Sequence, residues 1–198
     1  HHLISDQRIN WNRINAFHMD EYIGLLPDAP QSFGNFLRIR IFDKVPFKNV
    51  YYLNGHATDL EEECTRYTSL LSQFPTDIVC LGIGENGHIA FNDPDAANFN
   101  DPKLIKIVKL DHVCRQQQVN EKCFETLEQV PTEALTLTIP ALLKAKWMFC
   151  IVPFKNKSQA VYRTIHGDIS EKCPASILRR KEKSSLYLDT ESAQLLNL

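Results

Sequence analysis

Features that would assign the chain to a special class are largely missing from the sequence. Among its 198 residues no apolar run approaches the length of a membrane-spanning helix, and the stretch 1–17 holds no apolar core of a secretion signal. No charge of one sign dominates, since 22 basic and 24 acidic residues give a net charge of −2. This balance gives no electrostatic reason to expect nucleic acid or a membrane surface as a partner.

Cysteine pairs at close spacing are also missing. The six cysteines lie at positions 64, 80, 114, 123, 150 and 173, and none forms a C-x-x-C pair. This spacing does not predict zinc or another metal. Cys80 and Cys150 lie in apolar runs that predict buried strands. Scattered and partly buried cysteines in a chain of this size indicate reduced thiols and a cytoplasmic protein.

The sequence does contain a regular alternation of strand-like and helical patterns. Strands are predicted over residues 15–19, 50–54, 77–83, 103–110, 134–139, 147–153 and 184–189. Helices are predicted over residues 32–45, 59–74, 140–145, 156–167 and 174–180. The alternation predicts one α/β domain over residues 1–198, with a doubly wound, mainly parallel, Rossmann-like sheet and helices on both faces. The nearly all-apolar run 77–83 is typical of a strand covered on both faces.

Ligands of such sheets bind beyond the carboxyl ends of the strands, so polar residues that follow strands are the candidates. The loop after residues 77–83 contains Gly84, Gly87, His88 and Asp93. Glycine permits a sharp turn and close approach to a ligand, and a carboxylate five residues from a histidine can fold back to orient its ring. The alternative is a tight turn with a packed histidine. The position at a strand end and the nearby Asp93 favour a catalytic loop.

Charged residues follow two other strands. Asp20 and Glu21 come after residues 15–19, where one of them could act as a general base; alternatively both are solvated or cap the next segment. Lys155 and Lys157 come after residues 147–153, near a helix start, where a lysine and the helix dipole favour an anion such as phosphate. The alternative is that both lysines are solvated.

Taken in order, four parts of the chain resemble one family. They are "AFHMDEYIGL", "GIGENGHIAFNDP", "VPTEALTLTIPAL" and the lysine after "CIVPF", and the resemblance runs from about Asn15 to the C-terminus. The family is that of the glucosamine-6-phosphate deaminases/isomerases. The resemblance implies aldose–ketose isomerisation with deamination, in which glucosamine 6-phosphate and water become fructose 6-phosphate and ammonia. It implies a small amino-sugar phosphate as ligand, no cofactor and no metal. Whether the protein forms a homo-oligomer stays open, because relatives range from monomers to hexamers.

The resemblance also implies catalytic roles. Asp20 would take the proton from C2 of the sugar, His88 would handle the proton of the ring oxygen, and Asp93 would orient His88. Some members carry Asp where this chain has Asn86 beside the Gly-His pair. Because an amide hydrogen-bonds but accepts no proton at neutral pH, Asn86 departs from a strict Asp–His–carboxylate triad.

Phosphate contacts follow from the same resemblance. Lys157 matches the family's phosphate lysine, while Lys122 and Arg115 compete for a second cationic contact. Gly84 and Gly87 belong to the loop that approaches the substrate. The family opens with a strand, a Gly-Gly-Ser/Thr-Pro phosphate loop and a helix, to which nothing here corresponds. The chain is therefore expected to be N-terminally truncated, the alternative being a short homologue without that loop.

Three other functions stay open at this stage. The same chemistry on galactosamine 6-phosphate would use the same motifs, since these contact C1, C2 and the phosphate. A 6-phosphogluconolactonase would usually carry G-H-T-A-S-L-F where this chain has "GHIAFND". A non-catalytic sugar-phosphate sensor would explain Asn86 and the unmatched phosphate loop, but it has no chemical need for both Asp20 and His88.

Overall fold

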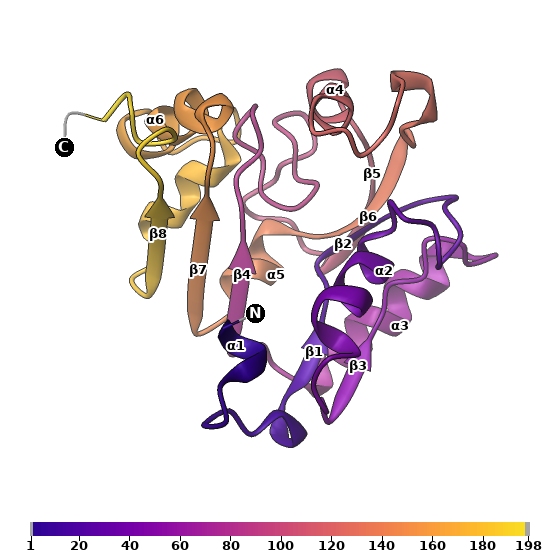
Figure 1. The fold of residues 1–198 in the computed structure, drawn as a ribbon. Coiled ribbons are helices and arrows are strands. Elements are labelled where there is room, and N and C mark those ends of the chain that lie inside the picture. Colours follow the sequence, from indigo (N-terminus) through magenta and orange to yellow (C-terminus); the bar gives the residue numbers. More distant parts are fainter. Residues whose placement is uncertain (1, 197–198) are drawn as a thin grey trace.

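Strands and short helices alternate along residues 2–196, the part of the chain described by a computed structural model (Figure 1). The strands are β1 (Asn15–Phe17), β2 (Asp20–Tyr22), β3 (Asn49–Tyr51), β4 (Ile78–Leu81), β5 (Ile105–Lys109), β6 (Glu133–Leu137), β7 (Trp147–Val152) and β8 (Ser184–Leu188). The α-helices are α1 (His2–Ser5), α2 (Phe33–Leu37), α3 (Leu60–Gln73), α4 (His112–Asn120), α5 (Ile139–Leu143) and α6 (Ser158–His166). The 3-10 helices are η1 (Trp11–Arg13), η3 (Leu127–Gln129), η4 (Lys155–Lys157) and η5 (Pro174–Arg180), and η2 (Arg38–Phe42) is a π-helix.

The strands form parallel and antiparallel groups. β4, β7 and β8 make a parallel sheet in that order, and β1 pairs with β3 in parallel. These pairs, with the helices between them, confirm the predicted α/β class. A further sheet, β2–β6–β5, is antiparallel. Alternation alone does not predict this sheet, because neither of its pairs is joined by a hairpin.

Local signals set the ends of several helices. The side chain of Asp59 accepts hydrogen bonds from two backbone N–H groups in the first turn of α3 and so caps this helix, whose start agrees with the helix predicted from residue 59. On α3 Tyr67 and Leu71, four residues apart, are buried on the same face. Thr138 caps α5 in the same way, and Pro140 occupies its first turn, where its missing N–H costs nothing.

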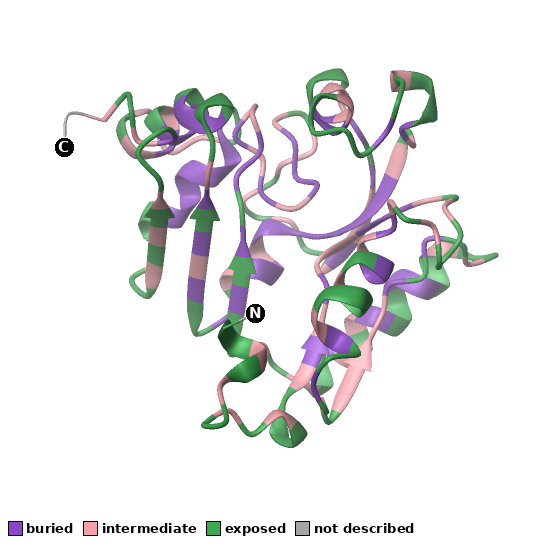
Figure 2. Ribbon diagram, viewed as in Figure 1, coloured by how far each residue is buried: buried purple, intermediate pink, exposed green. Residues whose placement is uncertain are grey.

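The parallel sheet β4–β7–β8 is covered on one face only, so the prediction of strands buried on both faces is wrong for β4 and β7. Ile78 and Cys80 on β4, like Trp147 and Ile151 on β7, are exposed and alternate with buried neighbours (Figure 2). The buried side chains pack with α5, α6 and η5 in the main hydrophobic core. A buried Cys80 is therefore a wrong prediction, because it points to the open face; Cys150 points inward and is buried as predicted.

The single helix predicted over residues 32–45 is replaced by α2 followed by η2. A π-helix holds an extra residue in each turn, which rotates the side chains that follow. As a result Phe42 turns into the core, where its ring lies 5.7 Å from that of Tyr52. Phe36 on α2 and Ile39 on η2 are exposed.

The fold gathers several segments at one end of the parallel sheet. The arrows of β4, β7 and β8 point the same way in Figure 1, and α4 and α6 lie beyond their tips with the loop after β4 between them. Hydrogen bonds tie this loop to both helices: Gln117 of α4 accepts from the backbone N–H of Glu85, and Arg163 of α6 donates to its carbonyl. The predicted loop therefore lies at the carboxyl end of the sheet.

Candidate active site

Asp20 and Glu21 are neighbours on β2, but their carboxylates have different surroundings. Glu21 is buried and accepts four hydrogen bonds, three of which come from the start of α2. The donors, at 2.8–3.1 Å, are the backbone N–H groups of Tyr22, Phe33 and Gly34 and the hydroxyl of Ser32. No hydrogen bond or ion pair found among residues 2–196 uses the Asp20 carboxylate. The two interpretations of this pair each fit one residue: Glu21 is a cap and Asp20 is available for chemistry.

The surroundings of Asp20 make its carboxyl a weaker acid than that of an ordinary aspartate. Burial, with a smaller contribution from the charge of Glu21, raises the pKa of Asp20 to about 7. Behind it, the ring of His18 donates from Nδ1 to the Asp20 carbonyl at 3.0 Å and accepts at Nε2 from the Leu53 N–H at 2.8 Å. Burial lowers the pKa of His18, so this ring is neutral and holds the backbone of β2 in place.

The ring of His88 is held at Nδ1 by two oxygens. Asn86 Oδ1 lies 2.8 Å from Nδ1, and Asp93 Oδ1 lies 2.9 Å from it. The amide of Asn86 has one orientation, because its Nδ2 donates to carboxylate oxygens of Asp93 at 2.9 Å and Asp111 at 2.8 Å. Since both neighbours of Nδ1 are acceptors, Nδ1 carries a proton, and Nε2 is the nitrogen left for chemistry.

Asp93 is held in its ionised form beside this histidine. Burial by itself would raise the pKa of the Asp93 carboxyl, but the hydrogen bond and charge of His88, with the Asn86 amide, outweigh it and lower that pKa. The carboxylate is therefore ionised beside Nδ1 and stabilises the imidazolium. Although Asp is one methylene shorter than the Glu that the family often carries, its oxygen reaches Nδ1 at 2.9 Å.

The glycines of the loop make room for His88 and shape the turn. A Cβ at Gly84 would overlap atoms of the His88 ring, and the Gly84 N–H donates to the His88 carbonyl at 2.9 Å. Gly87 has φ +91°, a conformation that other residues rarely adopt, and a Cβ there would lie 2.8 Å from the sulfur of Cys173. Both glycines thus shape the loop that carries His88.

A Gly84→Ala variant tests this packing. The methyl group would displace the His88 ring, so we expect the free energy of unfolding to fall by about 2–3 kcal/mol. Gly82→Ala is the matched control, because a Cβ there meets nothing closer than the Ile151 carbonyl at 3.5 Å; it should change stability by about 0.5 kcal/mol or less. Urea unfolding of both variants measures the difference, and equal stabilities would contradict this account.

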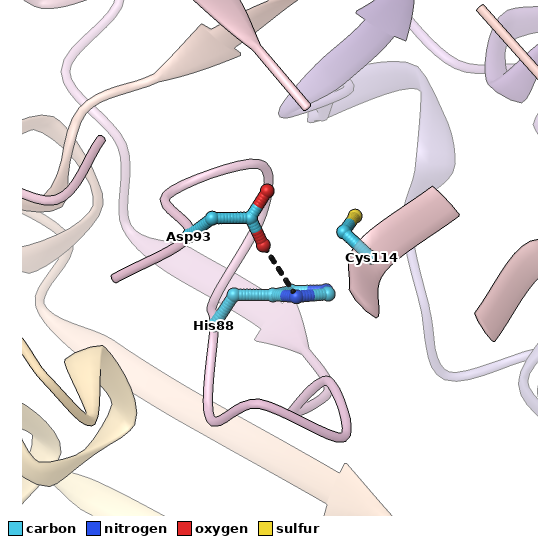
Figure 3. Close-up of side chains that lie close together, drawn as sticks. All are labelled: His88, Asp93 and Cys114. Atoms are coloured by element: carbon cyan, nitrogen blue, oxygen red, sulfur yellow. Dashed lines mark ion pairs between the residues drawn. The ribbon is translucent and has the colours of Figure 1, made fainter. Parts of the chain in front are cut away.

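The loop after β4 and the start of α4 meet at one buried thiol, that of Cys114. Figure 3 shows the His88 ring extending beneath the Asp93 carboxylate toward Cys114 at the start of α4. Burial and then the charges of Asp93, Asp111 and Asp20 raise the pKa of the Cys114 thiol. The charges of carboxylates on the loop, at the start of α4 and on β2 therefore all act on one side chain, so the element that carries the predicted base lies near the predicted histidine.

Hydrogen bonds to β6 connect the two halves of this site. Asp20 lies opposite Thr136 in the β2–β6 register, and the Thr136 hydroxyl accepts from the Phe91 N–H in the histidine loop at 3.1 Å. One residue on, Asn92 donates to the Leu137 carbonyl at 2.8 Å. The loop and β2 are thus fixed to the same strand, so their separation does not depend on a flexible connection.

Lys157 is joined to the loop through α4. Its ammonium group is buried and lies 3.0 Å from Glu121, just past the end of α4. Gln117 donates to the same Glu121 oxygen at 2.9 Å and accepts from the Glu85 N–H at 2.9 Å. A carboxylate therefore occupies the position beside Lys157 that an anionic ligand group would take. Lys155 is exposed, so only Lys157 fits the predicted anion site.

The structure separates the two candidates for a second cationic contact. The guanidinium of Arg115 donates to the carbonyls of Leu127 at 2.6 Å and Val130 at 2.9 Å, so it holds the chain after η3. Lys122 is exposed and lines an open cavity of about 860 Å³. This cavity includes Gln31, Val119, Cys123, Phe124, Glu125 and Gln129, but none of the catalytic candidates. Lys122 is thus the residue with a charge available to a ligand.

Several residues of the site were missed by sequence reasoning. Cys114, Asp111 and Glu121 had no assigned role, because each contacts residues distant in sequence. His88, Asp93 and Cys114 also have potential metal-ligand atoms within 4.8 Å of one another, although the cysteine spacing does not predict a metal. In this structure His88 and Asp93 bond each other and the thiol is protonated, so the three atoms are engaged in a hydrogen-bonded cluster.

The fold and this site are those of an α/β enzyme that acts on sugar phosphates. Sequence comparison shows the family. The chain belongs to the family described as glucosamine-6-phosphate isomerases/6-phosphogluconolactonase, whose model matches residues 1–187. It is 40% identical over 188 residues to the glucosamine-6-phosphate deaminase of Bacillus cereus (strain B4264), covering 95% of this chain and 70% of that protein. The corresponding deaminase of Bacillus thuringiensis (strain Al Hakam) is 39% identical over the same shares.

Solved structures agree with this placement. A structure described as a monomeric glucosamine-6-phosphate deaminase matches 98% of this chain and 80% of its own, with a TM-score of 0.88 and 34% identity. The 6-phosphogluconolactonase of Thermotoga maritima matches 92% of this chain and 75% of its own, with a TM-score of 0.70 and 22% identity. The second likeness shows a shared fold. None of the helices among residues 2–196 is long and apolar enough to cross a membrane.

Proposed function

We propose that the protein deaminates and isomerises glucosamine 6-phosphate, giving fructose 6-phosphate and ammonia. The observation that carries the proposal is a carboxylate for which no hydrogen bond is found among residues 2–196, Asp20, together with a histidine held by Asp93, both near the buried thiol of Cys114. The pKa of Asp20 of about 7 suits a group that must both take and return a proton near neutral pH. Deaminases at 40% identity and a deaminase structure with a TM-score of 0.88 support the same chemistry.

Ring opening is the first step, and His88 is placed for it. The neutral His88 ring takes the proton of the C1 hydroxyl at Nε2, and the imidazolium so formed, stabilised by Asp93 at Nδ1, gives this proton to the ring oxygen. The ring C1–O bond breaks, which leaves an open-chain aldehyde with the amino group still on C2. Because Nδ1 is bound by two oxygens, the ring presents the same nitrogen to the sugar in every turnover.

Proton transfer between carbons follows, and Asp20 performs it. The ionised carboxylate takes the proton from C2, the electron pair moves toward the C1 aldehyde, and the aldehyde oxygen takes a proton from water to give an enol that carries the amino group. The carboxyl group then returns a proton to C1, which forms an imine at C2. The nitrogen gives one proton back to water when the imine forms. Water adds to this imine and ammonia leaves, so one water is consumed for each ammonia released. A group with a pKa near neutrality serves both directions of this transfer.

The phosphate is held by lysine in this proposal. Lys157 is buried and already faces an oxygen anion, that of Glu121, so a phosphate oxygen would take the place of this carboxylate or share the ammonium group with it. Lys122 is proposed as the second contact, because Arg115 is bonded to two backbone carbonyls. This arrangement requires phosphate on the sugar and gives no reason for binding an unphosphorylated amino sugar.

A Lys157→Met variant should raise KM for glucosamine 6-phosphate about 10- to 100-fold and change kcat much less, since a charge-assisted contact to the phosphate is lost. Lys155→Met removes the same charge two residues away from an exposed position and is the control. Steady-state kinetics of both variants measure the effect. Equal KM values for the two variants would remove Lys157 from the phosphate site.

The proposed activity is tested with the purified chain and three substrates. Glucosamine 6-phosphate should release ammonia and fructose 6-phosphate in equal amounts. Galactosamine 6-phosphate differs only at C4 and should react more slowly, while 6-phosphogluconolactone should not be hydrolysed. Binding of glucosamine 6-phosphate without ammonia release would show a sensor instead, and lactone turnover would show a hydrolase.

We further propose that the protein works in the cytoplasm. All six cysteines are unpaired, as reduced thiols are in that compartment. Its oligomeric state is proposed to be monomeric, because a 34% identical deaminase structure is described as monomeric. Size-exclusion chromatography with light scattering tests this: a mass near 22.8 kDa is expected, and a multiple of it would contradict the proposal.

A further inference from the structure

Asp111 connects the start of α4 to the histidine loop through both of its carboxylate oxygens. Oδ1 accepts from the Cys114 N–H at 2.6 Å and so caps α4. Oδ2 accepts from the Asn86 amide at 2.8 Å, and this amide also holds Asp93 and His88. The carboxylate therefore has two functions in the structure, of which the cap needs only one oxygen.

Other helix caps in the chain show that the second contact is not a general property of capping. Asp59 caps α3 with a single oxygen, Oδ1, which accepts from both Glu61 and Glu62. Asp59 is exposed and its side chain touches no residue outside α3 in these hydrogen bonds. The inward oxygen of Asp111 is thus an additional feature, and it points at the group that orients His88.

The charges of the site explain why an amide stands at position 86. Asn86 lies within hydrogen-bond distance of two carboxylates, Asp93 and Asp111. An aspartate at this position would bring three carboxylates together with one histidine, at a large electrostatic cost in a buried site. Because position 86 carries an amide, the second carboxylate is that of Asp111, which is connected to His88 through Asn86. Removing it would leave one amide hydrogen of Asn86 without an acceptor.

We propose that Asp111 is a positioning residue for His88 that acts through Asn86. By accepting from Nδ2 of Asn86, it turns the amide so that Oδ1 faces Nδ1 of the histidine. Without it Nδ2 of the amide keeps one carboxylate acceptor, Asp93, in place of two. The amide is then held less firmly, and orientations in which its NH₂ group faces Nδ1, which favour the other tautomer of the ring, gain population. This inference rests on the proposed role of His88 in ring opening.

An Asp111→Asn variant tests the proposal, with Asp59→Asn as the same change at an ordinary cap. The asparagine at 111 retains an oxygen for the Cys114 N–H but turns an NH₂ group toward the NH₂ group of Asn86. We expect kcat to fall about 10- to 100-fold with KM changed less than about threefold, because misorientation of a catalytic group lowers rate more than binding. Asp59→Asn should stay within about twofold of wild type.

A spectroscopic measurement separates positioning from folding and from activity. In ¹⁵N-histidine-labelled protein, His88 is assigned by comparison with a His88→Gln variant. The neutral wild-type ring should show one tautomer, protonated at Nδ1, and Asp111→Asn should show a mixture or the other tautomer. An unchanged tautomer in Asp111→Asn overturns the inference. This measurement stands even if glucosamine 6-phosphate is not turned over, so the two proposals can fail separately.

Exchange of the two residues gives a second test. Asn86→Asp alone creates the cluster of three carboxylates and should lose activity. Asn86→Asp combined with Asp111→Asn moves the acid next to His88 and restores a donor–acceptor pair between the two positions. The double variant should be about tenfold or more faster than Asn86→Asp. A double variant no faster than that single variant would count against a functional link between positions 86 and 111.

Discussion

An Asp20→Asn variant is expected to lose about 10³- to 10⁴-fold in kcat for ammonia release while becoming more stable than the wild type at pH 8. The substitution changes the volume of the side chain very little, and it removes no hydrogen bond found among residues 2–196. It removes the only proposed group that can move a proton between C2 and C1. A loss of activity accompanied by a gain in stability is unusual and identifies a carboxylate held in an unfavourable place for function.

The sign of the stability change follows from the raised pKa. The pKa of Asp20 is about 7 in the folded chain, against 3.8 for an ordinary aspartate. Between these two values the folded chain holds a proton that the unfolded chain has released. The contribution of this group to the free energy of unfolding is therefore complete below about pH 4. Its contribution is lost as pH rises through about 7, by up to about 4 kcal/mol. The asparagine does not titrate, so the variant avoids this loss.

Two measurements check the prediction. Urea unfolding of both proteins at pH 5 and pH 8 should show a difference that grows toward pH 8 in favour of Asp20→Asn. In the wild type, kcat/KM should rise with pH through an apparent pKa near 7, because the carboxylate must be ionised to accept the C2 proton. Activity within tenfold of wild type in Asp20→Asn would show that another group is the base.

The sequence predicts most clearly what depends on neighbouring residues. The start of α3 follows from Asp59 and the acidic turn after it, all within a few positions, and the structure confirms it. The strand pattern placed Asp20 and His88 after predicted strands; in the structure His88 follows β4, whereas Asp20 begins the separate strand β2. What separates Asp20 from Glu21, however, is a set of hydrogen bonds from residues 32–34, eleven to thirteen positions away from Glu21. No local pattern contains that information, so one of two adjacent carboxylates could be chosen only by resemblance.

The same limit applies to the histidine network and to the sheet. Asp111 is 25 residues from Asn86, and its second contact depends on where α4 packs. The exposed face of β4 and β7 is equally hard to predict. An apolar run such as 77–83 predicts burial on both faces, whereas the exposure of Ile78 depends on which elements actually cover the sheet.

Glu21→Gln should have the opposite consequence to Asp20→Asn, although it makes the same chemical change on the next residue. The carboxylate of Glu21 accepts four hydrogen bonds, two at each oxygen. In glutamine one of these oxygens becomes an NH₂ group that faces two donors, at least one of them a backbone N–H that cannot turn away. We expect the free energy of unfolding to fall by about 2–4 kcal/mol.

The pair of variants separates the two functions of the β2 carboxylates. For Glu21→Gln, kcat at a temperature where the variant is folded should stay within about tenfold of wild type, because Glu21 caps α2 and does not face the substrate. Urea unfolding and steady-state kinetics of both variants, at the same pH, measure all four quantities. If Glu21→Gln unfolded like the wild type but lost activity as Asp20→Asn is expected to, the base and the cap would have to be reassigned. The assignment depends on the geometry of β2, since alternation along a strand sends adjacent side chains to opposite sides, one toward α2 and one toward the site.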